Sequence, residues 1–202
     1  MVTPGQRIGL LGGSFNPAHD GHLRISRFAL ERLRLDRVWW LVSPGNPIKS
    51  HVELDGQAQR LAAARKMAAR DRRIVVTGFE ARLPSAFTAA TLSFLQRRHP
   101  ATHFVWLMGA DNLVSFHRWR DWRGILDHIP VAVIDRPGWR LRGLSSRAAG
   151  RYRDQFVPEQ YAGRLPGMAA PAWTFLTAPL SPLSSTALRA ARQAAIRPHP
   201  KA

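Results

Sequence analysis

Short apolar runs alternate with longer segments of helical periodicity along most of the chain. Such runs predict buried strands, because parallel strands covered on both faces are apolar throughout. We expect strands at residues 7–12, 38–42, 73–77, 104–108, 131–134 and 173–176. We expect helices at residues 21–35, 57–69, 88–98, around 112–128, and at 184–195. This order predicts an α/β fold with a Rossmann-like, mostly parallel sheet and helices on both faces.

One segment, 137–171, follows neither periodicity. It is rich in Arg, Gly and Pro, which predicts an irregular excursion over the surface. The remaining pattern contains no internal repeat, and 202 residues suit one hydrophobic core. The sequence therefore predicts a single domain over residues 1–202.

Composition excludes several classes of protein. No uncharged apolar run is long enough for a membrane span, so no membrane partner is expected. The absence of cysteine excludes disulfides, thiolate metal ligands and cysteine nucleophiles. The first residues lead into a strand without the layout of a signal peptide. Together these features indicate a cytoplasmic enzyme.

The charge is strongly positive. Thirty Lys and Arg against 13 Asp and Glu give a formal net charge of +17. Such a balance indicates polyanionic partners, which could be nucleic acid, an acidic surface or phosphate-rich small molecules. The alternative is that a GC-rich genome favours arginine without any function for the extra charge.

The first predicted turn, GLLGGSFNPAHDGHL, is richer in glycine and histidine than a core turn requires. Gly12 and Gly13 leave the backbone bare at the carboxyl end of a strand, where ligands bind in parallel sheets. The following helix offers unpaired N–H groups and the positive end of its dipole, which favour an anion. His19 and His22 lie three apart at the helix entry, so both imidazoles can face one side. This arrangement suits the charge that develops on a phosphoryl group during transfer.

Three other interpretations of this turn are weaker. The two histidines could ligate a metal, but no third ligand stands nearby at metal-like spacing. The turn matches neither the dinucleotide pattern G-x-G-x-x-G nor the P-loop pattern, since no Lys-Ser/Thr pair follows. The remaining alternative is a pair of solvated histidines at a helix start.

The stretch GGSFNPAHDGHL resembles the "GG-T/S-F-D/N-P-x-H-x-G-H" signature of the nucleotidylyltransferase superfamily, an α/β fold named for its HxGH motif. Within the superfamily it is most similar to the bacterial nicotinate-nucleotide adenylyltransferases. The resemblance implies catalytic roles for both histidines. It also implies ATP binding by Gly12, Gly13, Ser14 and Phe15.

A second predicted anion site lies near the end of the chain, in SPLSSTALR. Three hydroxyl residues that favour an N-cap precede an Ala/Leu/Arg helix, which alone would be an ordinary capped helix. The stretch resembles the superfamily motif "I-S-S/A-T-x-I-R", which holds the β- and γ-phosphates of ATP. By that resemblance the ATP-binding residues are Ser184, Ser185 and Thr186, and Arg189 is catalytic.

The middle of the chain suggests the acceptor substrate. In GADNLVSFHRW, Asp111 follows a strand, where a carboxylate can accept a ribose hydroxyl or cap the next helix. The stretch resembles the family pattern "G-x-D-x-(7)-W", in which the tryptophan, here Trp119, stacks on the pyridine ring; the alternative is a core tryptophan. Arg120 stands where the family often has an aromatic residue. We hypothesise that its guanidinium favours the carboxylate of nicotinate over the amide of nicotinamide.

Three further stretches extend the resemblance over residues 8–189. PGNPIK resembles a loop whose lysine, here Lys49, faces the phosphates. SAFTAATL resembles the pyridine nucleotide pocket and implies a role for Thr88, although Ala90 replaces a common acidic residue there. IDRPG resembles a turn whose arginine, here Arg136, lies near the substrate.

The resemblance implies adenylyl transfer from ATP, with Mg²⁺ on the triphosphate, to nicotinate mononucleotide. The products are deamido-NAD and pyrophosphate, and no protein metal ligands are expected. A related transferase acting on another phosphate, such as phosphopantetheine, is the nearest alternative. From a different class, a basic nucleic-acid-binding protein would explain the charge; here nucleic-acid binding is expected to be nonspecific at most.

Overall fold

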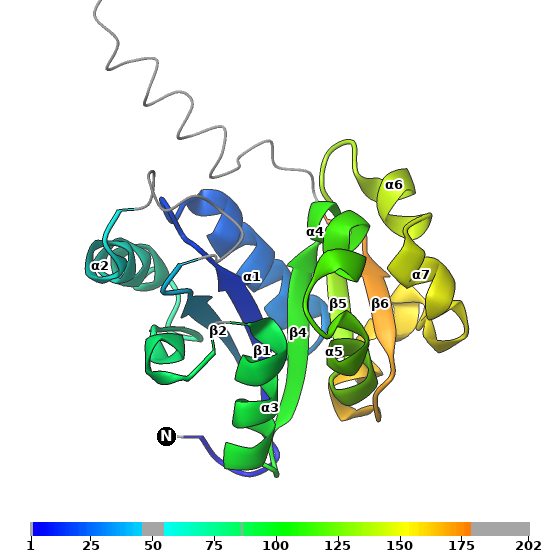
Figure 1. Ribbon diagram of the computed structural model, residues 1–202, viewed down its shortest axis with the longest axis horizontal. Helices are drawn as coiled ribbons and strands as arrows, with labels where there is room; N and C mark the ends of the chain where they lie inside the picture. The colour runs from blue at the N-terminus through cyan, green and yellow to red at the C-terminus, as the bar shows by residue number, and fades with distance from the viewer. Residues whose placement is uncertain (1, 46–54, 86, 179–202) are drawn as a thin grey trace, which may run out of the picture.

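The computed structural model describes residues 2–45, 55–85 and 87–178. Within these ranges six strands form one sheet in the order β3-β2-β1-β4-β5-β6, and every neighbouring pair is parallel. Their arrowheads point toward the same end of the sheet in Figure 1. The strands are β1 (Arg7–Gly13), β2 (Arg37–Val42), β3 (Ile74–Thr77), β4 (His103–Gly109), β5 (Val131–Ile134) and β6 (Trp173–Leu176). The predicted α/β fold and its six strands are confirmed.

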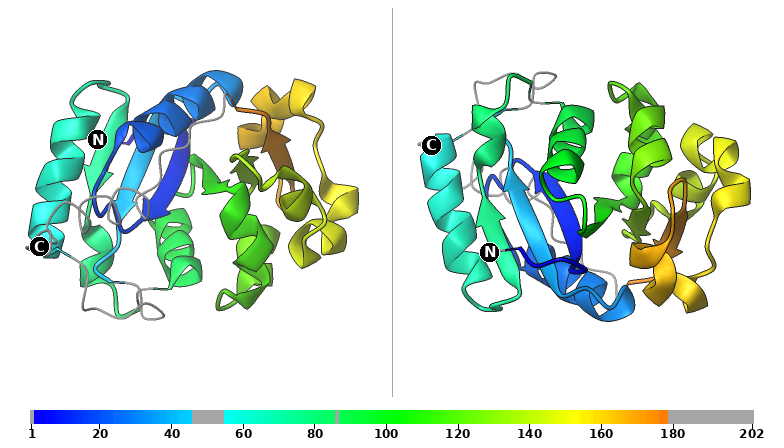
Figure 2. Two further views of the ribbon diagram at one scale, coloured as in Figure 1. Left: turned by 90° about the horizontal axis from the view of Figure 1, so that it is seen from above. Right: turned by 90° about the horizontal axis from the view of Figure 1, so that it is seen from below.

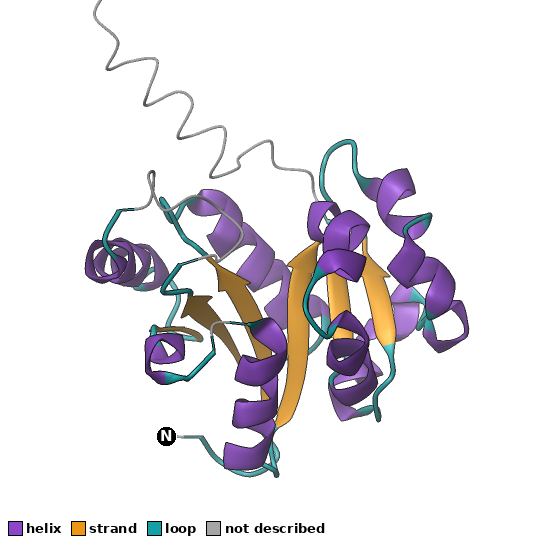
Figure 3. Ribbon diagram, in the orientation of Figure 1, coloured by secondary structure: helices purple, strands orange, loops and turns teal. Residues whose placement is uncertain are grey.

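Helices cover both faces of the sheet, as the two end-on views in Figure 2 show. One face carries α1 (Asp20–Arg32), α2 (Gln57–Ala68) and the 3-10 helix η5 (Glu159–Gly167), whose apolar residues share one core. The other carries α3 (Thr88–Arg98), α4 (Ala110–Ser115), α5 (Trp122–His128) and α7 (Arg147–Arg151) over a second core. Figure 3 shows the helices in purple around the orange sheet. None of the described helices is long and apolar enough to cross a membrane.

Helix α1 ends three residues before the predicted boundary because the backbone reverses at Arg34. This residue has φ +52°, in the left-handed region that ends helices. The N–H of Leu35 donates to the carbonyl of Leu30 at 2.9 Å, and that of Arg34 donates to Glu31 at 3.3 Å. These two bonds form a Schellman motif and turn the chain toward β2.

The helix expected around 112–128 is interrupted. The chain forms α4, then the 3-10 turn η3 (Phe116–Arg118), and only then α5. Asp121 has φ +53° and its carboxylate accepts the N–H of Gly124, so it begins a new helix. Aspartate tolerates this backbone conformation better than most residues, which apolar spacing alone does not reveal.

The segment 137–171 differs from its prediction. It contains α6 (Arg140–Leu144), α7 and the 3-10 helices η4 (Arg153–Gln155) and η5. Ala149, Tyr152 and Leu165 from this segment are buried. Helices α6, α7 and η4 are only about one turn long, and the nine residues of η5 form a 3-10 helix with a Pro inside it, so none of them shows the α-helical period. The segment therefore completes the edge of the fold around β6.

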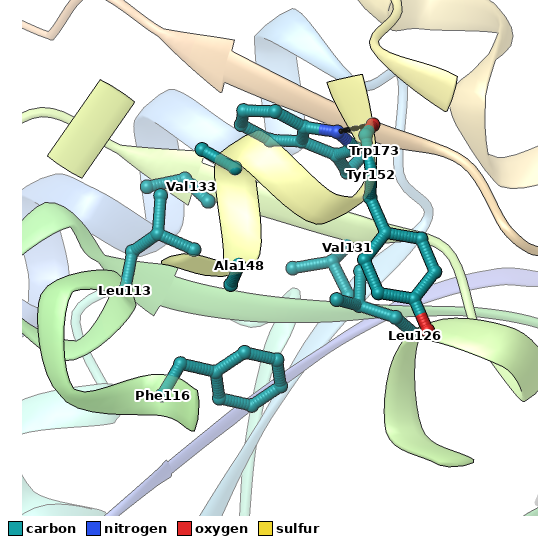
Figure 4. Close-up of a pocket in the computed structure, with 9 residues that line it drawn as sticks. Leu113, Phe116, Leu126, Val131, Val133, Ala148, Tyr152 and Trp173 are labelled. Atoms are coloured by element: carbon teal, nitrogen blue, oxygen red, sulfur yellow. Dashed lines mark hydrogen bonds between the residues drawn. The ribbon is translucent and has the colours of Figure 1, made fainter. Parts of the chain in front are cut away.

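A small apolar cavity of about 10 Å³ lies beneath α7 (Figure 4). Beside it, the indole N–H of Trp173 donates to the Tyr152 carbonyl at 2.7 Å. A cavity with apolar walls offers water no hydrogen-bond partner and stays dry. It is a packing gap, lined by Leu113, Phe116, Leu126, Val131, Val133, Ala148, Ala149, Tyr152 and Trp173.

The strand order fixes where a ligand can bind. From β1 the chain proceeds to β2 and β3 on one side, and then returns to β4 on the other. The helices that follow β1 and β4 therefore diverge to opposite faces, which leaves a crevice beyond the carboxyl ends of these two strands. Both central motifs of the sequence, the glycine–histidine turn and the Asp111 turn, lie at this switch point.

Candidate active site

The two histidines of the first turn lie against each other at the start of α1. His19 is the N-cap residue, and its Nδ1 accepts the N–H of Gly21 at 3.1 Å. The Nδ1 of His22 accepts the N–H of His19 at 3.3 Å. The ring centroids are 3.9 Å apart. The structure confirms that both imidazoles share one side, and His19 is buried rather than solvated.

These hydrogen bonds determine which ring nitrogen carries the proton. A backbone N–H can only donate, so each Nδ1 must offer its lone pair. In the neutral imidazole the proton then lies on Nε2. Each histidine is therefore an Nε2–H donor, and its Nδ1 is bound to a backbone N–H at the start of α1.

The surroundings keep both rings neutral. Burial lowers the pKa of His22 to about 3, with further contributions from His19 and Arg136. Burial likewise lowers the pKa of His19, and Arg136 adds to the effect while Asp20 opposes it. At neutral pH the pair consists of two uncharged donors, and the positive charge beside it belongs to Arg136.

Phe15 fixes the turn between β1 and the histidines. Its φ of +47° lies in the left-handed region, which a bulky residue adopts only when its surroundings hold it there. The ring is buried, stacks on Trp40 at 5.0 Å between centroids, and lies 4.7 Å from the ring of His22. Trp40 in turn donates to Ser26 in α1 at 2.7 Å. The turn is thus locked by aromatic packing.

The two glycines of the turn have different surroundings. A Cβ at Gly12 would meet the ring of Trp106 at 2.5 Å, whereas one at Gly13 would meet the Phe15 ring at an ordinary 3.4 Å. Core packing alone therefore requires glycine at position 12. Any role of Gly12, Gly13 and Ser14 in binding ATP remains a prediction.

Across the crevice, Asp111 and Arg136 form an ion pair. Arg136 Nη1 lies 2.6 Å from Asp111 Oδ2, and both side chains are half-buried. Asp111 Oδ1 is buried and has no partner among the described residues. Gly109 is the N-cap of α4 and no side chain caps this helix, so the alternative that Asp111 is the cap was wrong. The free oxygen leaves one acceptor for a ligand.

Trp119 lies beyond this pair, at the end of η3. Its ring is half-buried and contacts the edges of Phe116 and Trp106, with centroids 5.3 and 6.5 Å away. It is therefore not a fully buried core residue. Nearby, the guanidinium of Arg120 lies 4.7 Å from the centroid of the Phe87 ring. Phe87 is the N-cap of α3, and Thr88 is its first residue.

The remaining candidates lie outside the described residues. These are Lys49, which follows β2 in the sequence, and Ser184, Ser185, Thr186 and Arg189 of the second anion motif. Their roles remain predictions from the sequence. Among the residues that the structure does describe, no group of three His, Asp or Glu side chains is placed to hold a metal ion.

Sequence reasoning missed Arg60, which is 2% exposed in α2. It donates to four backbone carbonyls around the first turn. The spacing of four between Arg60, Ala64 and Ala68 could have indicated that the arginine lies on the buried face of the helix. The structure shows that all three residues are buried. An arginine in a stripe of buried alanines needs buried acceptors.

Comparison with known proteins agrees with this geometry. A family model described as cytidylyltransferase-like matches residues 10–191. A "Probable nicotinate-nucleotide adenylyltransferase" from Methylorubrum extorquens is 59% identical over 183 residues, covering 91% of this chain and 98% of the relative. The chain belongs to the nicotinate-nucleotide adenylyltransferases. A relative of the same description from Rhizobium meliloti is 51% identical over 92% of the chain and 98% of its own length.

A solved structure shares the fold at much lower identity. It is described as "Plasmodium falciparum nicotinic acid mononucleotide adenylyltransferase complexed with NaAD". The TM-score is 0.71 at 15% identity, over 92% of this chain and 83% of that one. The family model and the relatives confirm the predicted membership of the nucleotidylyltransferase superfamily, and this likeness shows that the fold is shared.

Proposed function

We propose that the chain transfers the adenylyl group of ATP to nicotinate mononucleotide, giving deamido-NAD and pyrophosphate. The observation that carries this proposal is the pair of neutral Nε2–H donors at the switch point, opposite the Asp111–Arg136 pair. It is supported by relatives of 51–59% identity that bear the name of this activity.

The reaction needs little covalent chemistry from the protein. An oxygen of the nicotinate mononucleotide phosphate attacks the α-phosphorus of ATP, and the bond from that phosphorus to the β-phosphate oxygen breaks. The attacking phosphate is already an anion at pH 7, so no general base is required. The protein must bring two anions together and stabilise the charge in transit.

His19 and His22 do this as fixed donors. Their Nε2–H groups donate to oxygens of the transferred phosphoryl group, while the backbone holds each ring by Nδ1. Because Nε2 already carries a proton, neither ring offers a metal a lone pair there. Arg136 supplies positive charge on the opposite wall, and Asp111 Oδ1 accepts a ribose hydroxyl.

The remaining roles rest on the sequence resemblance. Lys49 and Arg189 balance phosphate charge, while Ser184, Ser185 and Thr186 hold the outer phosphates of ATP. ATP enters as its Mg²⁺ complex, since a triphosphate binds the ion with its own oxygens. We place the reaction in the cytoplasm, because both substrates are multiply charged metabolites.

A direct assay tests this function. ATP and nicotinate mononucleotide are incubated with the protein and pyrophosphate release is followed, with phosphopantetheine as the alternative acceptor. We expect release with the nicotinate nucleotide only. Release with phosphopantetheine alone would replace the proposed acceptor, and release with neither would contradict the proposal.

Arg120 selects the acid form of the pyridine ring in this proposal. Its position over Phe87 brings a guanidinium to the start of α3, near Thr88. Arg120→Met should raise KM for nicotinate mononucleotide about 10-fold, because a charge-assisted hydrogen bond is lost, and leave KM for nicotinamide mononucleotide unchanged. Arg123→Met, which removes an exposed arginine nearby, is the matched control. Equal use of acid and amide by the unaltered protein would contradict this role.

A further inference from the structure

Arg60 places a buried positive charge directly behind the nucleotide-binding turn. Its Nη1 donates to the carbonyl of Ser14 at 2.6 Å and to that of Ser43 at 2.9 Å. Its Nη2 donates to Pro44 at 3.1 Å and its Nε to Asp55 at 2.9 Å. One side chain of α2 thus joins the end of β1, the end of β2 and the segment that leads into α2.

This arrangement is costly for stability alone. Burial lowers the pKa of Arg60, partly offset by Asp55, and the ion pairs formed among the described residues do not include it. Backbone carbonyls satisfy the guanidinium instead. An apolar residue beside Ala64 and Ala68 would fill the same face without removing a charge from water.

The contact with Ser14 has a geometric consequence for the site. Among the described residues the only cis peptides precede Pro17 and Pro171, so the Ser14–Phe15 peptide is trans. In a planar trans peptide the C=O and N–H point in opposite directions. Because Arg60 holds the Ser14 carbonyl, the N–H of Phe15 must face away from α2. Arg60 likewise donates to the Pro44 carbonyl, so the N–H of Gly45 points away from Arg60.

The Arg60 contact also supports a strained backbone. Phe15 follows Ser14 and has φ +47°, a conformation that persists only where neighbouring contacts fix it. Its ring is held by Trp40 and His22, while its preceding carbonyl is held by Arg60. The turn is therefore fixed from both sides of its peptide plane.

We infer that Arg60 is a positioning residue, which aims the backbone N–H groups of Phe15 in the first turn and Gly45 after β2 at the phosphates of ATP. The inference rests on the proposed function for the identity of the nucleotide. Arg60 does not touch the substrate and acts through Ser14 and Pro44. A guanidinium is required because only its planar fork reaches carbonyls on two separate loops.

Three variants test this role. Arg60→Met keeps the aliphatic stem and removes all donors, and Arg60→Lys keeps the charge but concentrates its donors at one point. Arg65→Met changes an exposed arginine of the same helix and is the control. ATP affinity is measured by calorimetry without any acceptor, alongside KM for each substrate, kcat and the melting temperature.

We expect kcat/KM for ATP to fall about 100-fold in Arg60→Met, the cost of misplacing a binding group by about 1 Å. The Kd for ATP should rise, KM for nicotinate mononucleotide should change less than about 3-fold, and Arg60→Lys should be intermediate. Arg65→Met should match the unaltered protein.

A purely structural arginine would lower the melting temperature and leave the Kd and KM for ATP unchanged, which would overturn the inference. If Arg60→Met does not fold, Arg60→Lys decides in the same way: wild-type ATP affinity overturns the inference and weaker affinity supports it. Calorimetry separates this outcome from failure of the proposed function, since ATP binding does not depend on which acceptor is used.

Discussion

Two groups of polar side chains at the switch point differ in their charge. At the β1–α1 turn the polar groups are neutral, and the backbone holds both His19 and His22 by Nδ1. In the second group, Asp111 at the start of α4 and Arg136 in the segment after β5 are charged and pair with each other. The β1–α1 turn offers directed donors and the Asp111–Arg136 pair offers charge.

The difference shows how a protein of strongly positive net charge can keep two histidines uncharged. Burial lowers the pKa of both histidines, and Arg136 lowers them further. The positive charge beside the two imidazoles therefore comes from arginine rather than from histidine.

Removing a donor from the first turn should have the largest effect. We expect His22→Ala to lower kcat about 100- to 1,000-fold, as for the loss of one preorganised donor at a developing charge. The Kd for ATP should change little, because the contact strengthens in the transition state. Steady-state kinetics and calorimetry measure the two quantities.

The matched control is His103→Ala, which removes an exposed histidine at the opposite end of β4. It should leave kcat unaltered. An unchanged kcat in His22→Ala would remove this residue from the mechanism.

Breaking the Asp111–Arg136 pair should lower the rate less, and it should also shift the pKa of the two histidines. Arg136→Met should lower kcat/KM about 10- to 100-fold, because it removes positive charge and leaves Asp111 unpaired in a half-buried site. It should also raise the pKa of both histidines, since Arg136 lowers them. NMR titration of the imidazoles measures this shift.

Arg32→Met is the control for Arg136→Met, because it breaks an exposed ion pair with Glu159. Its effect on rate should be negligible. If the histidines of Arg136→Met titrate as in the unaltered protein, the two imidazoles are electrostatically independent of Arg136.

The turn glycines offer a sharper contrast. Gly12→Ala should destabilise the fold by about 1–3 kcal/mol, because its Cβ would overlap the rigid ring of Trp106. In Gly109→Ala the Cβ would meet Asp111 Oδ1 at 2.4 Å and Arg136 Cδ at 3.1 Å, and both atoms belong to side chains that can rotate away. Urea unfolding should therefore respond to the first substitution, and kcat/KM to the second.

Gly13→Ala is the control for steric overlap, because its Cβ would lie 3.4 Å from the Phe15 ring, an ordinary van der Waals distance. It should be less destabilising than Gly12→Ala. The contrast fails if both Gly12→Ala and Gly109→Ala lower stability equally.

Stability should depend on the neutral state of the first turn. A histidine whose pKa is lowered to about 3 from 6.5 binds fewer protons folded than unfolded across that interval. Its contribution is therefore complete above about pH 6.5 and is lost progressively as pH falls toward 3. Urea unfolding at pH 7.5 and 5.5 should show a smaller loss for His22→Gln than for the unaltered protein. Equal losses would mean that another group controls this range.

The smallest effect concerns the cavity beneath α7, remote from both turns. Val133→Ile adds one methyl group from a buried strand residue that lines it. We expect stabilisation of about 0.5 kcal/mol, a rise of about 1–2 °C in melting temperature, and unchanged kinetics. A loss of stability would mean that the gap is too small to fill.

The sequence predicted the strands because an apolar run carries enough information to place a buried strand. It placed His19 and His22 together because helix geometry brings residues three apart to one side. The same local logic failed at Arg34 and Asp121, where a left-handed backbone ended or restarted a helix within a continuous pattern. It also failed in 137–171, where helices of about one turn show no periodicity.

By itself the sequence determined the fold class, the glycine–histidine turn and the resemblance that names the substrates. The three-dimensional fold was needed to show that Asp111 pairs with Arg136, that Trp106 requires glycine at position 12, and that Arg60 holds the Ser14 carbonyl. The first set depends on contacts between neighbours in sequence. The second depends on groups far apart in the sequence, such as Asp111 and Arg136 at 25 residues and Ser14 and Arg60 at 46, which meet only because the parallel strands lie side by side.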